Sequence, residues 1–321
     1  MYEKYKEHDL KVYGGYVNDK EVLSCSSGGI GTALAREMIR RGGYVIGVAY
    51  SKDFYKAEYI VARSEADLER LKGSKYIDVA NINKIYTVTK EYLENNKQIL
   101  FFGLPCVIGA LRKNLQKEYD NLITVELICN GPTYSDIHFQ YVKYLEKKFK
   151  SKIVDFSVRY KKEKWSPSYL YAKFENGKEF IKEFYQTEYG FAMAIYGKPA
   201  CYKCKFKGNN RQADLMIGDF WGISSTNIEY NELGTSVVFA HTRRGDQFIN
   251  ETKGITLFET SFENAVRNNL MVIQSKEEHR ERKKFEDLFK KKGLIYACKK
   301  TSFRKAKIKR AIKHLIEHQK K

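Results

Sequence analysis

Proline is scarce in this 321-residue sequence, with only 4 residues, and the 22 glycines follow no internal repeat. A collagen-like or linker-rich chain is therefore excluded. No apolar run reaches the roughly 18 to 20 residues that a membrane-spanning helix requires, and residues 1–10 lack the apolar segment of a secretory signal. We therefore expect a cytoplasmic protein with reduced cysteines, in which close cysteine pairs indicate metal or redox sites before disulfides.

The positive charge of the sequence lies mostly near its C-terminus. The formal net charge is +19, and residues 276–321 alone hold 18 basic and 6 acidic residues. Within this segment Ile308, Ile312, Leu315 and Ile316 follow helical spacing, which predicts a basic amphipathic helix. Such a helix could lie on the anionic inner face of a membrane, bind an acidic partner such as a ferredoxin, or pack on the body of the protein. Nucleic-acid binding is not expected.

Apolar strand patterns alternate with helical patterns in the first half of the chain, which predicts an α/β fold with a mixed sheet and flanking helices. A change to short aromatic strands at 153–184, with a hairpin turn at 175–177, predicts a smaller antiparallel lobe. After Gly222 we expect one strand at 236–241 and then a basic helical tail. The expected strands of the first half are 44–50, 98–102 and 122–128, and the expected helices are 32–39, 64–72, 83–95, 107–115 and 135–150.

Four of the 6 cysteines stand where a shared site could form. Cys201 and Cys204 make a C-x-x-C pair, while Cys106 and Cys129 each follow a predicted strand. The carboxyl ends of parallel strands meet at one edge of a sheet, where ligands gather. Four thiolates would suit a [4Fe–4S] cluster or a zinc ion, although Cys106 and Cys129 could equally be small buried residues. Cys25 is interpreted as a packing residue, and Cys298 receives no role.

Two short loops have the composition of ligand-binding turns. Residues 26–29, Ser-Ser-Gly-Gly, precede a predicted helix, and backbone N–H groups in such a turn can bind a phosphate. Neither a Walker lysine nor a complete G-x-G-x-x-G accompanies them, so a plain tight turn explains the pattern as well. Residues 73–76, Gly-Ser-Lys-Tyr, put a cation beside an aromatic ring, which fits a phosphate, a flavin edge or a surface turn.

Two further segments contain aromatic and charged side chains together. Residues 218–222, Gly-Asp-Phe-Trp-Gly, fit a loop against a planar ligand or cluster, or an aromatic anchor of the core. Arg159 with Lys161 or Lys162, followed by Trp165, is consistent with the solvated face of a strand.

Taken in order, these segments resemble the coenzyme F420 hydrogenase/dehydrogenase beta subunit family. The resemblance covers about residues 12–245 and is carried by the segments 26–34, 73–76, 102–106, 128–132, 201–204 and 218–222. It implies an N-terminal family domain at 12–95, a C-terminal family domain with the cysteines at 96–260, and a basic helical tail at 261–321. It also implies an enzyme that passes electrons between a [4Fe–4S] cluster, a flavin and a hydride-accepting substrate.

The resemblance assigns roles to particular residues. The cluster ligands would be Cys106, Cys129, Cys201 and Cys204. The FAD or FMN would lie beside Ser27, Gly28, Gly29, Ser74 and Lys75. Lys75 is the candidate catalytic residue, because a cation there could stabilise the reduced, anionic flavin.

The sequence departs from the family pattern in two places. Many members begin with a ferredoxin-like cysteine segment, whereas the first cysteine here is Cys25, so we expect electrons from a separate ferredoxin. Asn130 stands where the family usually has histidine, and it cannot titrate near neutral pH, which argues against proton delivery from this position. A non-catalytic or zinc-binding relative that serves polysaccharide-synthesis enzymes is the alternative.

The lysine-rich, alanine-poor composition resembles that of low-GC bacteria, where coenzyme F420 is not expected. The family members of surface-polysaccharide gene clusters are then the nearer comparison. They imply a small-molecule substrate such as a sugar derivative.

Overall fold

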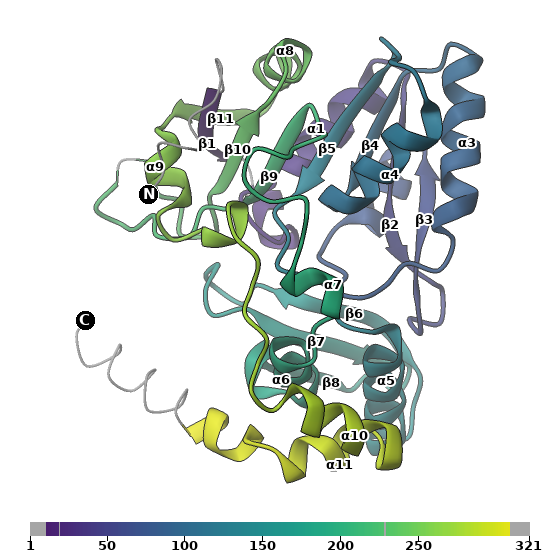
Figure 1. The fold of residues 1–321 in the computed structure, drawn as a ribbon, viewed down its shortest axis with the longest axis vertical. Helices are drawn as coiled ribbons and strands as arrows, with labels where there is room; N and C mark the ends of the chain where they lie inside the picture. Colours follow the sequence, from purple (N-terminus) through teal and green to yellow (C-terminus); the bar gives the residue numbers. More distant parts are fainter. Residues whose placement is uncertain (1–10, 19, 228, 309–321) are drawn as a thin grey trace.

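The computed structural model describes residues 11–18, 20–227 and 229–308. A mixed sheet of eight strands has the order β11-β1-β10-β9-β5-β4-β2-β3, and a second sheet has the antiparallel order β6-β7-β8. The large sheet contains β1 (Lys11–Val17), β2 (Tyr44–Tyr50), β3 (Ala57–Ala62), β4 (Ile99–Gly103), β5 (Leu122–Leu127), β9 (Leu215–Asp219), β10 (Ser236–Ala240) and β11 (Ile255–Glu259). Figure 1 shows the small sheet lying below the large one.

The strands in the middle of the large sheet are buried on both faces. Within β4, Ile99, Leu100 and Phe101 are all fully buried, and successive residues point to opposite faces. Leu100 therefore packs with one set of helices, α1 (Ile30–Arg40), α2 (Glu65–Leu71) and α8 (Arg243–Glu251). Phe101 packs with α3 (Ile82–Glu94) and α4 (Pro105–Leu115), while α9 (Phe262–Val266) covers the β9–β10 end of that face.

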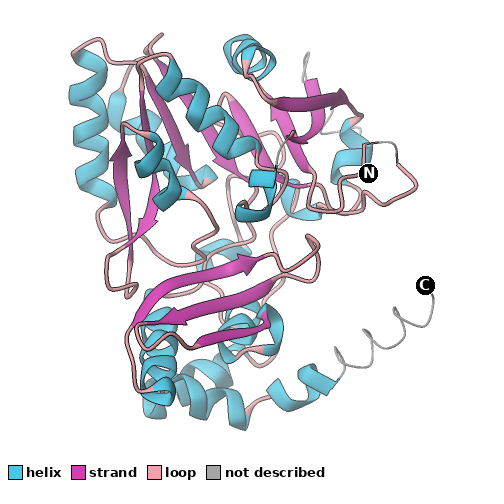
Figure 2. Ribbon diagram, turned by 180° about the vertical axis from the view of Figure 1, so that it is seen from behind, coloured by secondary structure: helices cyan, strands magenta, loops and turns pink. Residues whose placement is uncertain are grey.

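The small sheet has its own core, which several helices complete. It consists of β6 (Ile153–Tyr160), β7 (Tyr169–Phe174) and β8 (Glu179–Glu183), and helices lie under one of its faces in Figure 2. These helices are α5 (Ser135–Phe149), α6 (Glu188–Ile195), α10 (Arg282–Lys292) and α11 (Leu294–Lys300). Phe285 of α10 and Ala297 of α11 are buried in that core. The remaining short elements are α7 (Pro199–Tyr202), η2 (Lys20–Ser24), η3 (Phe184–Gln186) and η4 (Leu270–Val272).

The predicted fold class is confirmed: the protein is α/β, with a mixed sheet and a smaller antiparallel lobe. The hairpin turn lies where it was predicted, since the Gly177 N–H donates to the Phe174 carbonyl and Gly177 has a positive φ of 78°. The expectation of a single strand after Gly222 is wrong, because β11 follows β10 and pairs with β1. Residues 312–316 of the predicted amphipathic helix lie outside the described residues.

Candidate redox site

The four predicted ligand cysteines lie at the carboxyl edge of the large sheet. Cys106 is the second residue of α4, directly after β4, and Cys129 follows β5. Strands β4 and β5 are parallel neighbours, with Gly103 opposite Glu126, so both cysteines stand at the same edge. Cys201 belongs to the short helix α7, and Cys204 follows it.

Gly131 shows how closely the cysteine segments approach each other. Its backbone N–H donates to Cys129 Sγ at 3.2 Å. A Cβ atom on Gly131 would lie only 3.0 Å from Cys201 Sγ, and its φ of 85° disfavours any other residue. Gly131 therefore permits the loop after β5 to lie against α7 with a thiol on either side.

Electrostatic effects link all four thiols. Desolvation raises the pKa of the Cys106 thiol to about 11, and neighbouring Cys129, Cys204 and Cys201 add to the rise. Burial likewise raises the pKa of Cys129 and of Cys201. Cys25 and Cys298 are buried elsewhere, beside the Thr32 hydroxyl and the Glu188 carbonyl respectively. The structure therefore brings together the four predicted cysteines and leaves out the other two.

Two partly buried cations, Lys207 and Arg211, lie near the gathered thiols. The Lys207 ammonium donates to the carbonyls of Cys129 and Met271. Arg211 pairs with the buried Glu126 at 3.1 Å, and burial raises the pKa of Glu126 to about 7 against the opposing effect of Arg211. These positive charges favour the thiolate forms that burial disfavours.

The raised pKa of Cys106 predicts an unusual pH dependence of its alkylation in the cluster-free protein. Only the thiolate reacts, so the rate should rise about tenfold per pH unit and continue to rise through pH 10. Peptide mass spectrometry after timed iodoacetamide treatment would measure it, with glutathione as the reference thiol. A plateau of the Cys106 rate near pH 8.5 would contradict the raised pKa.

The two glycine-containing loops meet at the same edge of the sheet. The Ser74 hydroxyl donates to Ser26 Oγ at 2.9 Å, although 48 positions separate the two residues. Ser27 donates to the Thr235 carbonyl at 3.1 Å, and Gly28 N–H donates to Ser236 Oγ at 3.0 Å. The loops predicted to lie beside a flavin are therefore neighbours, and protein groups satisfy part of their hydrogen bonding.

In residues 26–29, here called the serine loop, glycine is required at positions 28 and 29 for two different structural reasons. A Cβ on Gly28 would lie 2.5 Å from the Gly15 carbonyl oxygen, so this glycine allows the loop to pack on β1. Gly29 has a φ of 86° and precedes α1, whose first turn receives no side-chain cap. The free N–H groups of such a first turn are suited to an anion.

Lys75 makes contacts that the sequence did not indicate. Its ammonium donates to four carbonyls at the end of α2, those of Arg70, Leu71, Lys72 and Gly73, at 2.7 to 3.2 Å. A cation there offsets the negative end of the helix dipole. Burial lowers the pKa of Lys75 to about 7. Its predicted place beside a flavin stays a prediction.

Two cations next to the serine loop are buried. The interpretation of Arg159 and Lys161 as part of a solvated strand face was therefore wrong. Arg159 is 7% exposed and Lys161 only 3%. Arg159 donates to the Ser26 carbonyl and to Asp219 Oδ2, both at 2.9 Å. Lys161 donates to the carbonyls of Val22 and Ser27, at 2.7 and 2.5 Å. Arg159 and Lys161 therefore join the end of β6 to the serine loop through hydrogen bonds. In the sequence, only the spacing of the two cations along one strand face could have indicated this contact.

The Gly218–Gly222 segment joins the same arrangement. Asp219 ends β9, and its Oδ1 accepts from the indole N–H of Trp165 at 3.2 Å. Trp165 stacks on Trp221 with ring centroids 4.8 Å apart, and the Arg159 guanidinium lies over the Trp221 ring. The carboxylate and the aromatic rings thus hold the small lobe against the edge of the large sheet.

The comparisons with known proteins agree with this geometry. Two family models match, which describe the N-terminal and the C-terminal parts of the coenzyme F420 hydrogenase/dehydrogenase beta subunit. The N-terminal model matches residues 12–86, and the C-terminal model matches residues 96–264. The chain belongs to this beta subunit family. The second match covers more than half of the chain and contains all four gathered cysteines, so the family resemblance stated from the sequence is confirmed.

A solved structure shares the fold of this beta subunit family member. It is described as "Xenon derivatization of the F420-reducing [NiFe] hydrogenase complex from Methanosarcina barkeri". The similarity has a TM-score of 0.54 and 17% sequence identity, and it covers 90% of this chain and 97% of the other. No curated protein matches the chain. Membership of a hydrogenase/dehydrogenase beta subunit family supports an oxidoreductase-type role in electron transfer.

The described residues were compared with the requirements of a metal site and of a membrane-spanning helix. Among residues 11–18, 20–227 and 229–308, no group of three or more His, Cys, Asp or Glu side chains is placed to hold a single metal ion. Within the same ranges, no helix is both long and apolar enough to cross a bilayer.

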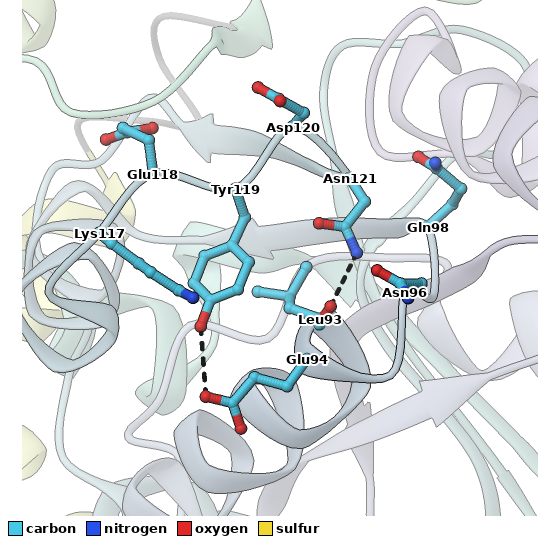
Figure 3. A pocket seen from close by; sticks show the side chains of 9 residues that line it. All are labelled: Leu93, Glu94, Asn96, Gln98, Lys117, Glu118, Tyr119, Asp120 and Asn121. Carbon is cyan, nitrogen blue, oxygen red and sulfur yellow. Dashed lines mark hydrogen bonds between the residues drawn. The ribbon is translucent and has the colours of Figure 1, made fainter.

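A surface pocket lies away from the cysteines. Figure 3 shows it between the end of α3 and the loop before β5, with Tyr119 hydrogen-bonded to Glu94 and Asn121 to the Leu93 carbonyl. The pocket borders the amino ends of β4 and β5, whereas Cys106 and Cys129 follow their carboxyl ends. It is therefore separate from the candidate site.

Proposed function

We propose that this chain is an iron–sulfur flavoprotein that passes electrons between a [4Fe–4S] cluster, a flavin and a hydride-accepting substrate. The observation that carries the proposal is the convergence of four thiols from three separate segments, at the same edge of the large sheet as the loops 26–29 and 73–76. Cys106, Cys129, Cys201 and Cys204 would hold the cluster. The other two cysteines lie elsewhere, so the gathered set equals the ligand number that such a cluster takes.

The family resemblance favours a cluster over zinc. All four gathered cysteines lie in the segment that the C-terminal family model matches, and four thiolates are the set that a [4Fe–4S] cluster takes. A zinc ion also accepts four thiolates. A zinc-binding, non-catalytic relative is therefore the second proposal.

The serine loops support a flavin on the neighbouring side. Ser27, Gly28, Gly29 and Ser74 would line it, and the uncapped start of α1 suits its phosphate groups. When bound, a flavin exchanges single electrons on one side and a hydride on the other. The chain's part is to position it: Arg159 and Lys161 fix the Ser26–Ser27 backbone through one carbonyl contact each. Lys75 is the proposed catalytic cation, since it is held in the same turn as Ser74.

The substrate and the partners follow from composition and family. We propose a small-molecule substrate such as a sugar derivative, in surface-polysaccharide synthesis, and a separate ferredoxin as electron donor. Coenzyme F420 is not the expected substrate. We further propose a cytoplasmic location, with the basic tail available to the inner face of the membrane.

Anaerobic purification is expected to yield a coloured protein. The absorption should include a broad shoulder near roughly 400 nm, with about four irons and four sulfides per chain and a bound flavin. Iron, sulfide and flavin assays on the same sample would measure this. A colourless protein that also fails reconstitution with iron, sulfide and flavin would sink the proposal, and one zinc per chain would favour the second reading.

A further inference from the structure

The segment that carries the C-x-x-C pair has an unusual charge. Residues 197–212 contain five cations and no carboxylate; the cations are Lys198, Lys203, Lys205, Lys207 and Arg211. Four bound thiolates would be stabilised by some positive charge at the site. The contacts of each cation show which of the five can offset the thiolate charge.

Three of the five cations have partners in the protein. Lys207 donates to two backbone carbonyls, Arg211 pairs with Glu126, and Lys198 pairs with Asp78. Burial lowers the pKa of Lys207 and of Arg211, while nearby cysteines oppose that effect. Lys276 and Lys198 also favour the thiolate of Cys201, so these partnered or partly buried cations are the ones that offset the charge of the thiolates.

Lys203 and Lys205 differ from the other cations of the segment. Both are exposed, and neither forms a salt bridge with any residue in the described parts of the chain. Lys203 stands between the two cysteines of the pair, so whatever it attracts comes close to Cys201 and Cys204. Two unpaired cations at this place attract acidic groups from solution.

The surface beside these lysines is partly apolar and includes an exposed cysteine. Gly109 of α4 lies against Phe206, which joins the lysine segment to the helix that begins at Pro105. Cys106 is the member of the cysteine set that reaches the surface, although the surrounding protein desolvates its thiol. Leu270 is 39% exposed, and the neighbouring Met271 carbonyl accepts from Lys207. A polar charged rim beside an apolar patch is the usual composition of a transient protein interface.

We propose that the surface formed by Lys203, Lys205, Cys106 and Leu270 is the docking site of an acidic electron-carrier protein. This inference rests on the proposed redox function. A carrier has to approach the electron-accepting group closely, and this surface is the part of the chain where exposed cations and a gathered cysteine coincide. Helix α10 begins beside α7, where Arg282 donates to the Gly197 carbonyl at 2.9 Å. The next helix, α11, lies below the small sheet in Figure 1, so docking on α11 would keep a carrier away from the cysteines.

The test compares two charge-reversal pairs in the full-length protein. The probe is an oxidised, acidic two-cluster bacterial ferredoxin, and biolayer interferometry measures its affinity at low and high salt. Lys203→Glu with Lys205→Glu should weaken binding at least tenfold at low salt, through slower association, and the difference should shrink in high salt. Iron content should stay at the wild-type value.

The matched control is Lys291→Glu with Lys299→Glu, two exposed positions on α10 and α11. It changes the net charge equally and should leave the affinity within about twofold of wild type. Equal weakening by both pairs, or stronger weakening by the control, would overturn the docking site. Absence of ferredoxin binding to a wild-type protein that contains its cluster would also overturn it, while the redox proposal would stand on the iron and flavin assays.

Discussion

Cys204→Ala is expected to remove most of the iron from the anaerobically purified protein. Cys204 would supply one of four ligands, and its backbone N–H, held by Ser275 Oγ at 2.9 Å, fixes the position of the residue. Loss of one thiolate leaves an incomplete set, and loss of the cluster removes the stability that its binding adds to the fold. The shoulder near roughly 400 nm should disappear, and the melting temperature should fall.

Cys298→Ala is the control for this prediction. Cys298 is 1% exposed and packs in the small-lobe core, on a different element from the gathered set. The substitution removes a sulfur without touching the site, so iron content should stay at the wild-type value. Wild-type iron in Cys204→Ala, or equal iron loss in both variants, would show that the ligand assignment is wrong.

The placement of Cys106 and Cys129 could be predicted because it depends on local signals. Apolar runs marked β4 and β5 as buried strands, and Pro105 and Gly131 marked where each strand gives way to the next element. Parallel neighbours in an α/β sheet then put both cysteines at one edge. The approach of the C-x-x-C pair to that edge followed only from the family resemblance, because no local pattern fixes a contact across some 70 residues.

Strand β1 was not predicted, because it too depends on contacts between residues that are distant in the sequence. Its Gly14–Gly15 pair resembles a break in the chain, yet both residues lie within the strand. A Cβ on Gly14 would stand 2.1 Å from the Phe258 ring, and one on Gly15 would stand 2.7 Å from Leu257. Because Phe258 and Leu257 belong to β11, more than 240 positions away, the need for glycine there becomes visible only in the folded protein.

The charged residues show the largest gap between sequence and structure. Lys75 caps a helix, and Arg159 and Lys161 are buried against carbonyls. A sequence gives the charge of a side chain but not its surroundings, and the cost of burial is offset only where several acceptors converge. Such convergence comes from tertiary contacts, which local sequence patterns do not contain.

Asp214→Ala is expected to be the most destabilising single substitution in the large sheet. Asp214 is fully buried beside β9, and its carboxylate accepts from Thr124 N–H at 2.8 Å and from the Thr124 and Thr242 hydroxyls at 2.7 and 2.8 Å. Arg244 Nε donates to it at 2.5 Å, and Arg112 contacts it at 3.4 Å. The carboxylate thus ties β5, β9 and the start of α8 together. Its removal leaves buried donors unpaired, which costs about 3 to 5 kcal/mol.

The same contacts predict how the loss depends on pH. Burial alone would raise the pKa of Asp214, but Thr124 and Arg244 hold it below its usual range. A lowered pKa means that the carboxylate stabilises the fold above the unfolded-state pKa of roughly 3.9, and that this contribution is lost as pH falls through the lower folded-state pKa. The difference between wild type and Asp214→Ala should therefore be constant from neutral pH to about pH 5 and shrink in stronger acid.

Urea unfolding of both proteins across this pH range would measure the difference, with Asp120→Ala as the matched control. Asp120 is an exposed aspartate in the loop before β5, and its removal should change the free energy of unfolding by no more than about 0.5 kcal/mol. A loss below about 1 kcal/mol for Asp214→Ala would mean that water replaces the carboxylate. The contacts of Asp214 would then contribute little to the joint between β5, β9 and α8, and the stability of that joint would have to come from apolar packing alone.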